Sequence, residues 1–303
     1  MNSVASQDAA DRLRDKDYLT TADGLFFNVI GYDHELDRAT ANLKYVHGTK
    51  WTAGYDAAVA FLAKEYPNYV RGLISVPRSL ITKIHRPQEG LRRLRSQADR
   101  NGLEQTAVDL AQECSDVFEI PLGRFGVTDS LLWGRGGNNS DIDLVVYGSD
   151  SALIVLDRIK SLYRRTRFER LRVENFTRQS TMRSAGVADL CRRKMNKGLY
   201  QGVRFSLRAV REWNEIESAE RFSFTAQGTV EVNARVADNS QSLFFPAMYQ
   251  LDSGLDLVSF LMEYEAVFTP GDSLKVKGTL EVGARNRIVV GSLLRQDHSI
   301  SWQ

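Results

Sequence analysis

Two aspartates separated by one residue, Asp141 and Asp143, are the side chains best suited to chemistry in this sequence. They begin a predicted strand over residues 141–147, and strand side chains alternate, so both carboxylates face one side about 7 Å apart. Leu144 to Tyr147 form a continuous apolar run, which predicts a strand buried on both faces. Paired carboxylates there repel each other unless a cation is present. The pair therefore predicts a Mg²⁺ or Mn²⁺ site, with a solvated strand end as the alternative.

The segment before these aspartates is suited to bind phosphate. Ser130 lies eleven residues before Asp141, and Gly134, Gly136 and Gly137 lie in the connection between them. Ser130 is predicted to start a short helix, where free backbone N–H groups attract phosphate. Glycines allow the backbone to approach phosphate oxygens closely. The alternative is an ordinary tight connection.

This pattern, Asp129-Ser130 followed by Ser140-Asp141-Ile142-Asp143-Leu144, resembles the active-site signature of the DNA polymerase beta-like nucleotidyltransferase superfamily. The resemblance implies that Asp141 and Asp143 hold the metal ions that bind a nucleoside triphosphate. It also implies a nucleotide site on the preceding segment, which would comprise Asp129, Ser130, Gly134, Arg135 and Ser140. Three further segments, which cover residues 14–46, 74–87 and 242–281, resemble uncharacterised archaeal nucleotidyltransferase-domain proteins.

Two positions depart from the family pattern. Asp129 stands where the family has glycine. The family usually has a third carboxylate on a later core strand, but the candidate strand VRFSLRAV, residues 203–210, contains none, and Arg208 is the polar residue at its far end. Glu212 and Glu215 follow this strand and are the candidates for the missing ligand. Without a third ligand, the site would bind a nucleotide without efficient chemistry.

The elements that position this site predict an α/β (α+β) fold in three parts. Residues 1–87 read as an N-terminal αβ region, with strands within 18–46 and a helix over 54–66. Residues 88–215 read as a polymerase-beta-like nucleotidyltransferase core, which starts with a long helix over 88–117. Residues 216–303 contain five strand-like runs separated by glycines, which predicts a small OB- or SH3-like β-barrel.

The charge distribution favours a polynucleotide partner. Residues 151–211 hold sixteen Lys and Arg against four Asp and Glu, whereas residues 212–303 hold seven against thirteen. The basic segment predicts an RNA-binding surface that includes Arg164, Arg165, Arg167, Arg192, Arg193 and Lys194. A solvated helical face is the alternative. Phe244, Phe245 and Tyr249 are candidates for base stacking, although a strand buried on one side explains them equally well.

Composition excludes several other classes of protein. With 43% hydrophobic and 26% charged residues the chain is ordinary globular protein. No apolar run is long enough to span a membrane, and the first residues lack the apolar core of a secretory signal. Two cysteines, Cys114 and Cys191, make neither a disulfide framework nor a four-thiolate metal site, so we expect a cytoplasmic protein.

The sequence therefore predicts a metal-dependent nucleotidyltransferase. It would move a nucleoside monophosphate from an NTP, such as ATP, to an acceptor hydroxyl and release pyrophosphate. Two Mg²⁺ ions about 4 Å apart on Asp141 and Asp143 would serve this chemistry. RNA is the favoured acceptor, and a protein hydroxyl or a small molecule remains open. The alternative is a non-catalytic nucleotide- or nucleic-acid-binding protein on a degraded transferase core.

Overall fold

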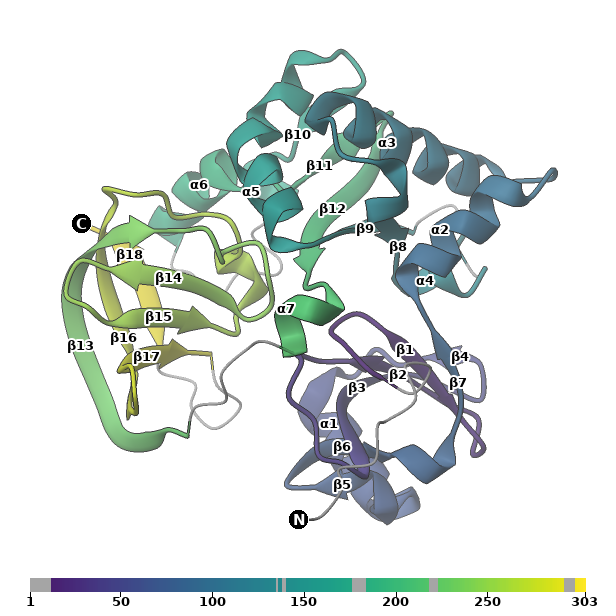
Figure 1. Cartoon of the computed structure of the whole chain (residues 1–303), viewed down its shortest axis with the longest axis horizontal. Coiled ribbons are helices and arrows are strands. Elements are labelled where there is room, and N and C mark those ends of the chain that lie inside the picture. The colour runs from purple at the N-terminus through teal and green to yellow at the C-terminus, as the bar shows by residue number, and fades with distance from the viewer. Residues whose placement is uncertain (1–11, 135, 138–139, 176–183, 218–222, 292–297) are drawn as a thin grey trace. The chain divides into compact units, whose positions relative to one another are not determined.

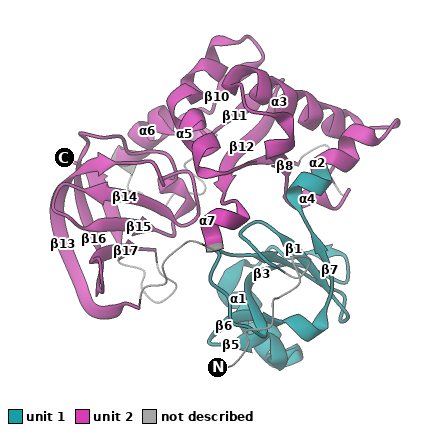
Figure 2. Ribbon diagram, in the orientation of Figure 1, with its two compact units in different colours: residues 1–90 teal, residues 91–303 magenta. Residues whose placement is uncertain are grey.

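The chain divides into two compact units, residues 1–90 and 91–303 (Figure 2). The computed structural model describes residues 12–134, 136–137, 140–175, 184–217, 223–291 and 298–303. The described residues form a mixed α+β fold with three β-sheets, one in the first unit and two in the second (Figure 1). The two predicted parts that carry the site and the barrel both lie in the second unit.

The first unit is built on an antiparallel sheet with the order β5-β6-β3-β2-β1-β7, and β4 pairs with β3. Helix α1 (Gly54–Glu65) ends before Pro67, as predicted, and buries Ala58 and Leu62. The strands are β1 (Tyr18–Thr21), β2 (Leu25–Val29), β3 (Arg38–Val46), β4 (Thr49–Lys50), β5 (Val70–Arg71), β6 (Leu73–Pro77) and β7 (Ile81–His85).

The long helix predicted over residues 88–117 is two helices, α2 (Pro87–Ser96) and α3 (Gly102–Phe118). Asn101 forms a capping box with Glu104, in which each side chain accepts a hydrogen bond from the other residue's backbone N–H. The Arg100 side chain donates to the carbonyl oxygens of Leu94 and Gln97 at the end of α2. Local capping of both helix ends therefore makes the break, and α3 begins at Gly102.

The second unit begins with a five-stranded sheet of order β10-β11-β12-β9-β8. Strands β9 and β12 are parallel, and the other pairs are antiparallel. Between α5 and β12 the chain contributes two short strands and one α-helix to this part, and residues 176–183 lie outside the described residues. The elements are β8 (Phe125–Val127), α4 (Asp129–Leu132), β9 (Ile142–Tyr147), α5 (Ser149–Arg158), β10 (Phe168–Arg170), α6 (Ser184–Arg193), β11 (Lys197–Tyr200), β12 (Val203–Val210) and α7 (Trp213–Glu217).

The five strands predicted after residue 222 form a closed barrel, because β13 pairs with both β14 and β16. The ring runs β13-β14-β15-β17-β16 and back to β13, and a sixth strand, which the sequence did not indicate, pairs with β16. These strands are β13 (Thr225–Asp238), β14 (Ala247–Leu251), β15 (Asp256–Ser259), β16 (Ser273–Val282), β17 (Arg287–Val290) and β18 (Ser299–Trp302).

The five-stranded sheet, called the core sheet below, has two faces that differ in what covers them. Ile142, Leu144 and Val146 of β9 share one hydrophobic core with residues of helices α3 and α5. Phe205, Leu207 and Ala209 of β12 belong to the same core. Because side chains alternate along a strand, the residues between them, including Asp143, lie on the opposite face. No helix among the described residues is long and apolar enough to cross a membrane.

Candidate functional site

The two predicted aspartates lie at the start of strand β9, on the face that α3 and α5 leave uncovered. Asp141 is exposed and Asp143 is half-buried, whereas the intervening Ile142 is fully buried. Residues 144–147 are all buried, so the prediction of a strand buried on both faces is confirmed. Asp143 therefore lies on the face opposite the α3 and α5 core, and Asp141 directly precedes the strand. Both carboxylates are close enough to the Lys197 ammonium to affect its pKa, and both offer hard oxygen ligands.

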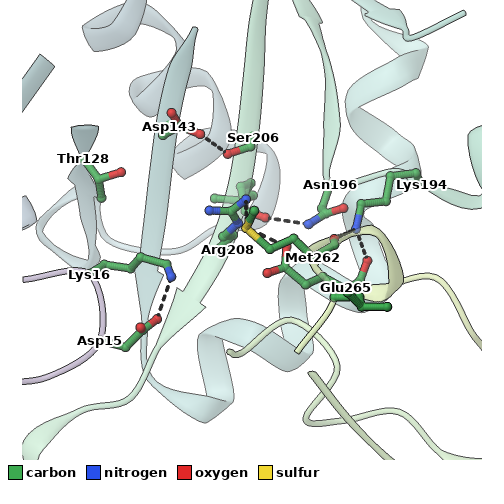
Figure 3. Close-up of polar contacts among 12 residues, drawn as sticks. Asp15, Lys16, Thr128, Asp143, Lys194, Asn196, Ser206, Arg208, Met262 and Glu265 are labelled. Atoms are coloured by element: carbon green, nitrogen blue, oxygen red, sulfur yellow. Dashed lines mark hydrogen bonds and ion pairs between the residues drawn. The ribbon is translucent and has the colours of Figure 1, made fainter. Parts of the chain in front are cut away.

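A row of polar side chains crosses three strands at Asp143. Ser206 of β12 lies opposite Asp143, and Lys197 of β11 lies opposite Ser206. The Ser206 hydroxyl donates a hydrogen bond to Asp143 Oδ1 at 2.5 Å (Figure 3). This donor satisfies one carboxylate oxygen and fixes its orientation. We call the sheet face that carries Asp143, Ser206, Lys197 and Arg208 the carboxylate face.

Arg208 is the next residue of β12 on the carboxylate face. Its Nε lies 3.1 Å from Glu265 Oε2, and its side chain is only 14% exposed. Burial alone would lower the pKa of Arg208, but three nearby carboxylates raise it above its usual value: those of Glu265, Asp143 and Asp129. The guanidinium is therefore a fixed positive charge beside the predicted metal ligands.

Lys197 adds a second cation to this face. Burial and the neighbouring guanidinium of Arg208 lower the pKa of Lys197, while the carboxylates of Glu265, Asp143 and Asp141 oppose that change. The influence of Asp141 and Asp143 on this ammonium is consistent with the strand register, which places Lys197 in the same row. The face thus combines acidic and basic groups within one partly buried cluster.

The backbone at Asp129 is in the left-handed region, with φ of 51°. Only glycine takes this conformation without a steric penalty, so the departure from the family pattern falls where glycine would be favoured. Gly134 also has a positive φ, of 65°, as its expected role in a tight connection requires. Helix α4, which begins at Asp129 and includes Ser130, is a single turn of four residues.

The remaining predicted nucleotide-binding residues lie in the connection to β9. Gly137 donates its backbone N–H to Ser140 Oγ at 3.1 Å, and the Ser140 N–H donates to the Gly137 carbonyl at 2.9 Å. These reciprocal bonds close a turn directly before Asp141. The Ser140 hydroxyl therefore holds this turn. Arg135 lies outside the described residues.

Glu212 and Glu215, the candidates for a third carboxylate, lie at the other end of the sheet. They follow Val210, which pairs with Tyr147 at the far end of β9 from Asp143. Glu212 pairs with Arg124 at 3.2 Å, and Glu215 accepts the Ser149 N–H at 2.6 Å at the start of α5. Both carboxylates have structural partners there. Among the described residues, no group of three or more His, Cys, Asp or Glu side chains is placed to hold a metal ion.

The predicted RNA-binding residues occupy three different environments. Three exposed arginines line a groove whose other wall is acidic: Arg164, Arg165 and Arg167 face Asp109, Glu113 and Asp116. Two residues of α6 form ion pairs, Arg192 with Asp189 and Arg193 with Asp272, the latter at 2.6 Å. The predicted basic surface is therefore partly neutralised by acidic neighbours.

Lys194 is the exception, and its assignment to a nucleic-acid surface is wrong. Its side chain is 2% exposed, and its ammonium donates to the carbonyl oxygens of Met262 and Glu265 at 2.8 and 2.6 Å. Burial lowers the pKa of Lys194 well below its usual range. The residue follows helix α6 and is enclosed by the segment after β15, so it ties this part of the core to the barrel.

Two of the three base-stacking candidates are core residues. Phe244 and Tyr249 are each 1% exposed, and Phe244 packs in the core of the five-stranded sheet. The backbone carbonyl of Leu243 accepts a hydrogen bond from Ala209 of β12 at 3.0 Å. The connection between β13 and β14, which includes Phe244, therefore packs against the core sheet. The buried rings of Phe244 and Tyr249 are inaccessible to a nucleotide.

Sequence reasoning missed Ser206, Lys197 and Glu265. The first had a detectable signal, because Arg204, Ser206 and Arg208 are the alternate, polar positions of an otherwise apolar strand. Lys197 was included only as part of a basic run. Glu265 is 57 residues from its partner Arg208, and no local pattern distinguishes it.

Comparison with known proteins finds one archaeal relative. An uncharacterised protein of Methanocaldococcus jannaschii is 25% identical over 333 aligned positions, which cover 93% of this chain and 96% of the relative. No protein-family profile matches the chain. No solved structure matches it either. The relative has the same overall extent as this chain, and its name states no activity.

Proposed function

We propose that this protein is a metal-dependent nucleotidyltransferase with a polymerase-beta-like core. The observation that carries the proposal is the pair Asp141 and Asp143 at the start of a buried strand, directly after a glycine-containing connection, with both carboxylates close to the ammonium of Lys197. The left-handed backbone at Asp129 supports it, because a turn of this kind brings backbone N–H groups towards a phosphate.

The donor set fits Mg²⁺ or Mn²⁺. Two carboxylates supply hard oxygen ligands, and Mg²⁺ commonly takes one or two carboxylates together with substrate phosphates. The neighbouring groups also fit a charged ligand, since Ser206 orients Asp143 and the cations of Arg208 and Lys197 lie on the same face. When bound, such an ion neutralises phosphate charge and polarises the acceptor oxygen.

The protein's own residues would bind and orient the two substrates. Ser130 and backbone N–H groups of the connection would hold the β- and γ-phosphates, and Asp141 and Asp143 would hold the ion. The acceptor oxygen forms a bond to the α-phosphorus, and the bond from that phosphorus to the bridging oxygen breaks. The electron pair of the broken bond leaves with pyrophosphate, and the acceptor hydroxyl releases its proton.

We propose a polynucleotide acceptor, in particular RNA. The support is the excess of basic residues over 151–211 and a five-stranded barrel whose third and fifth strands, β15 and β17, are parallel. We assign this barrel to the OB type, a class that often binds nucleic acid. Because the connection between β13 and β14 packs on the core, an acceptor would reach the barrel elsewhere. Phe260, which is 38% exposed beyond β15, is the aromatic side chain best placed for this.

A second candidate function is non-catalytic nucleotide binding. The observation that favours it is the candidate strand β12, which places Ser206 and Arg208 beside Asp143 and no carboxylate. Such a site would bind an NTP and leave it intact.

Incubation of the protein with each α-labelled NTP, Mg²⁺ or Mn²⁺ and total cellular RNA separates the two functions. A transferase moves the label into RNA or another acceptor and releases unlabelled pyrophosphate. Retention of all label as intact NTP, with measurable NTP binding, would favour the non-catalytic function instead.

A further inference from the structure

We infer that the site takes a single divalent ion with the triphosphate, and that the Arg208 guanidinium provides the second positive charge that another ion supplies in a two-metal transferase. This inference rests on the proposed nucleotidyl transfer. It concerns the number of ions and the residue that replaces one of them, so it can fail while that function holds.

The strand register shows which groups surround Asp143 on the carboxylate face. Ser206 lies directly opposite on β12, Arg208 is the next residue on the same face, and Lys197 lies beyond Ser206 on β11. All three are hydrogen-bond donors, and two are cations. A second ion needs a further carboxylate ligand, and the strands provide none on this face. The further carboxylates near Arg208 lie on other elements: Glu265 is paired with Arg208 itself, and Asp129 lies on α4.

Arg208 is held in place by the barrel. Nε pairs with Glu265 Oε2 at 3.1 Å, and Nη2 lies 3.4 Å from the Met262 sulfur. The ammonium of Lys194 binds the backbone carbonyl oxygens of both Glu265 and Met262 (Figure 3). Glu265 itself is 1% exposed, so the ion pair cannot easily rearrange into solvent. Glu265 is therefore a positioning residue for the guanidinium.

The orientation leaves part of the guanidinium available to a ligand. An arginine has five N–H donors in a planar fork that matches phosphate oxygens. Nε and Nη2 have the contacts named above, and Nη1 has no hydrogen-bond partner among the described residues. A triphosphate that enters beside Asp143 would thus meet a fixed cation without a second metal ion.

The number of bound ions tests this inference directly. The full chain is dialysed to equilibrium against Mn²⁺ and a saturating non-hydrolysable ATP analogue, and a protein-free chamber corrects for Mn²⁺ bound to the analogue in solution. We expect one Mn²⁺ per chain. Two ions per chain would overturn this inference and leave the proposed function intact. No bound Mn²⁺ would overturn both.

Substitution of the cation gives an independent test. We expect Arg208→Met to weaken binding of the Mn²⁺–analogue complex about tenfold or more, and Arg208→Lys to weaken it less, because lysine keeps the charge without the fork. Arg285→Met is the matched control, since it removes an exposed ion pair with Asp256 in the same unit, and its affinity should equal that of the wild type. Wild-type affinity in both Arg208 variants would overturn the assignment. If Arg208→Met fails to fold, Arg208→Lys and the ion count on the wild-type chain still decide it.

Discussion

Replacement of Asp129 by glycine tests how the triphosphate approaches the site. Asp129 has φ of 51° and lies at the start of α4, before the serine expected to contact phosphate. A carboxylate about 5 Å from a phosphate charge, at an effective dielectric constant of about 20, costs about 3 kcal/mol. Solvent access lowers this to about 1 kcal/mol, so we expect Asp129→Gly to bind Mg²⁺–NTP about fivefold more tightly.

The same substitution has opposing effects on stability. Relief of the left-handed backbone at a non-glycine residue contributes about 1 kcal/mol, and the greater chain entropy of unfolded glycine costs about 0.5–1 kcal/mol. The free energy of unfolding should therefore stay within about 0.5 kcal/mol of wild type. A change in affinity will then report on the site itself.

Isothermal titration calorimetry with a non-hydrolysable NTP and Mg²⁺ measures this affinity. Asp129→Asn is the matched control, because asparagine removes the charge and also tolerates the left-handed region. Tighter binding in both variants would show that the charge opposes the nucleotide, and a gain confined to glycine would identify the backbone as the cause. Weaker binding in both would refute the reasoning and identify Asp129 as a metal ligand. Unchanged affinity would place Asp129 outside the phosphate site.

Three further predictions concern the nucleotide site, the arginines of the groove and a buried carboxylate of the first unit. Mg²⁺ or Mn²⁺ with NTP should raise the melting temperature by several degrees at an NTP concentration about 100 times the dissociation constant, whereas NTP in EDTA should raise it much less. Equal shifts would show that arginine and lysine side chains bind the nucleotide without a metal ion. If RNA binds the chain through Arg164, Arg165 and Arg167, changing all three to alanine should reduce the slope of log binding constant against log salt concentration by about two to three. An unchanged slope would show that these arginines contact the acidic wall of their groove and not RNA. Burial raises the pKa of Asp17 to about 7, against the opposing charges of Arg86 and Arg14 and with a smaller contribution from Asp15, so this group's stabilisation is full below pH 3.8 and lost as pH rises through about 7. The melting temperature of Asp17→Asn should therefore fall less than that of wild type between pH 5 and 8. Identical pH profiles of the two proteins would contradict the raised pKa of Asp17.

The elements around the aspartates followed from local sequence signals. The apolar run after Asp143 predicted a buried strand, and β9 is buried along its length after Asp143. Alternation predicted β12 over residues 203–210, and glycine spacing predicted the strands that close the barrel. These signals depend on neighbouring residues alone, and the periodicity of side chains is sufficient to detect them.

The surroundings of the carboxylates could not be predicted in the same way. That Ser206 lies opposite Asp143 depends on the register of two parallel strands 63 residues apart. Lys194 lies in a basic run and is nonetheless buried, because the end of α6 packs against the segment after β15. Charge density along a sequence does not distinguish a basic surface from a cation enclosed by a second domain.

Transfer of label from an α-labelled NTP tests the central proposal most directly. With Mg²⁺ or Mn²⁺ and cellular RNA, the wild-type protein should transfer the labelled nucleotide to an acceptor. Asp143→Asn should reduce transfer to background while it keeps an acceptor for the Ser206 hydroxyl. The control Asp99→Asn, an exposed carboxylate between α2 and α3, should transfer as wild type does. Transfer by Asp143→Asn at the wild-type rate, or none by the wild-type protein with any NTP, would contradict the proposed function.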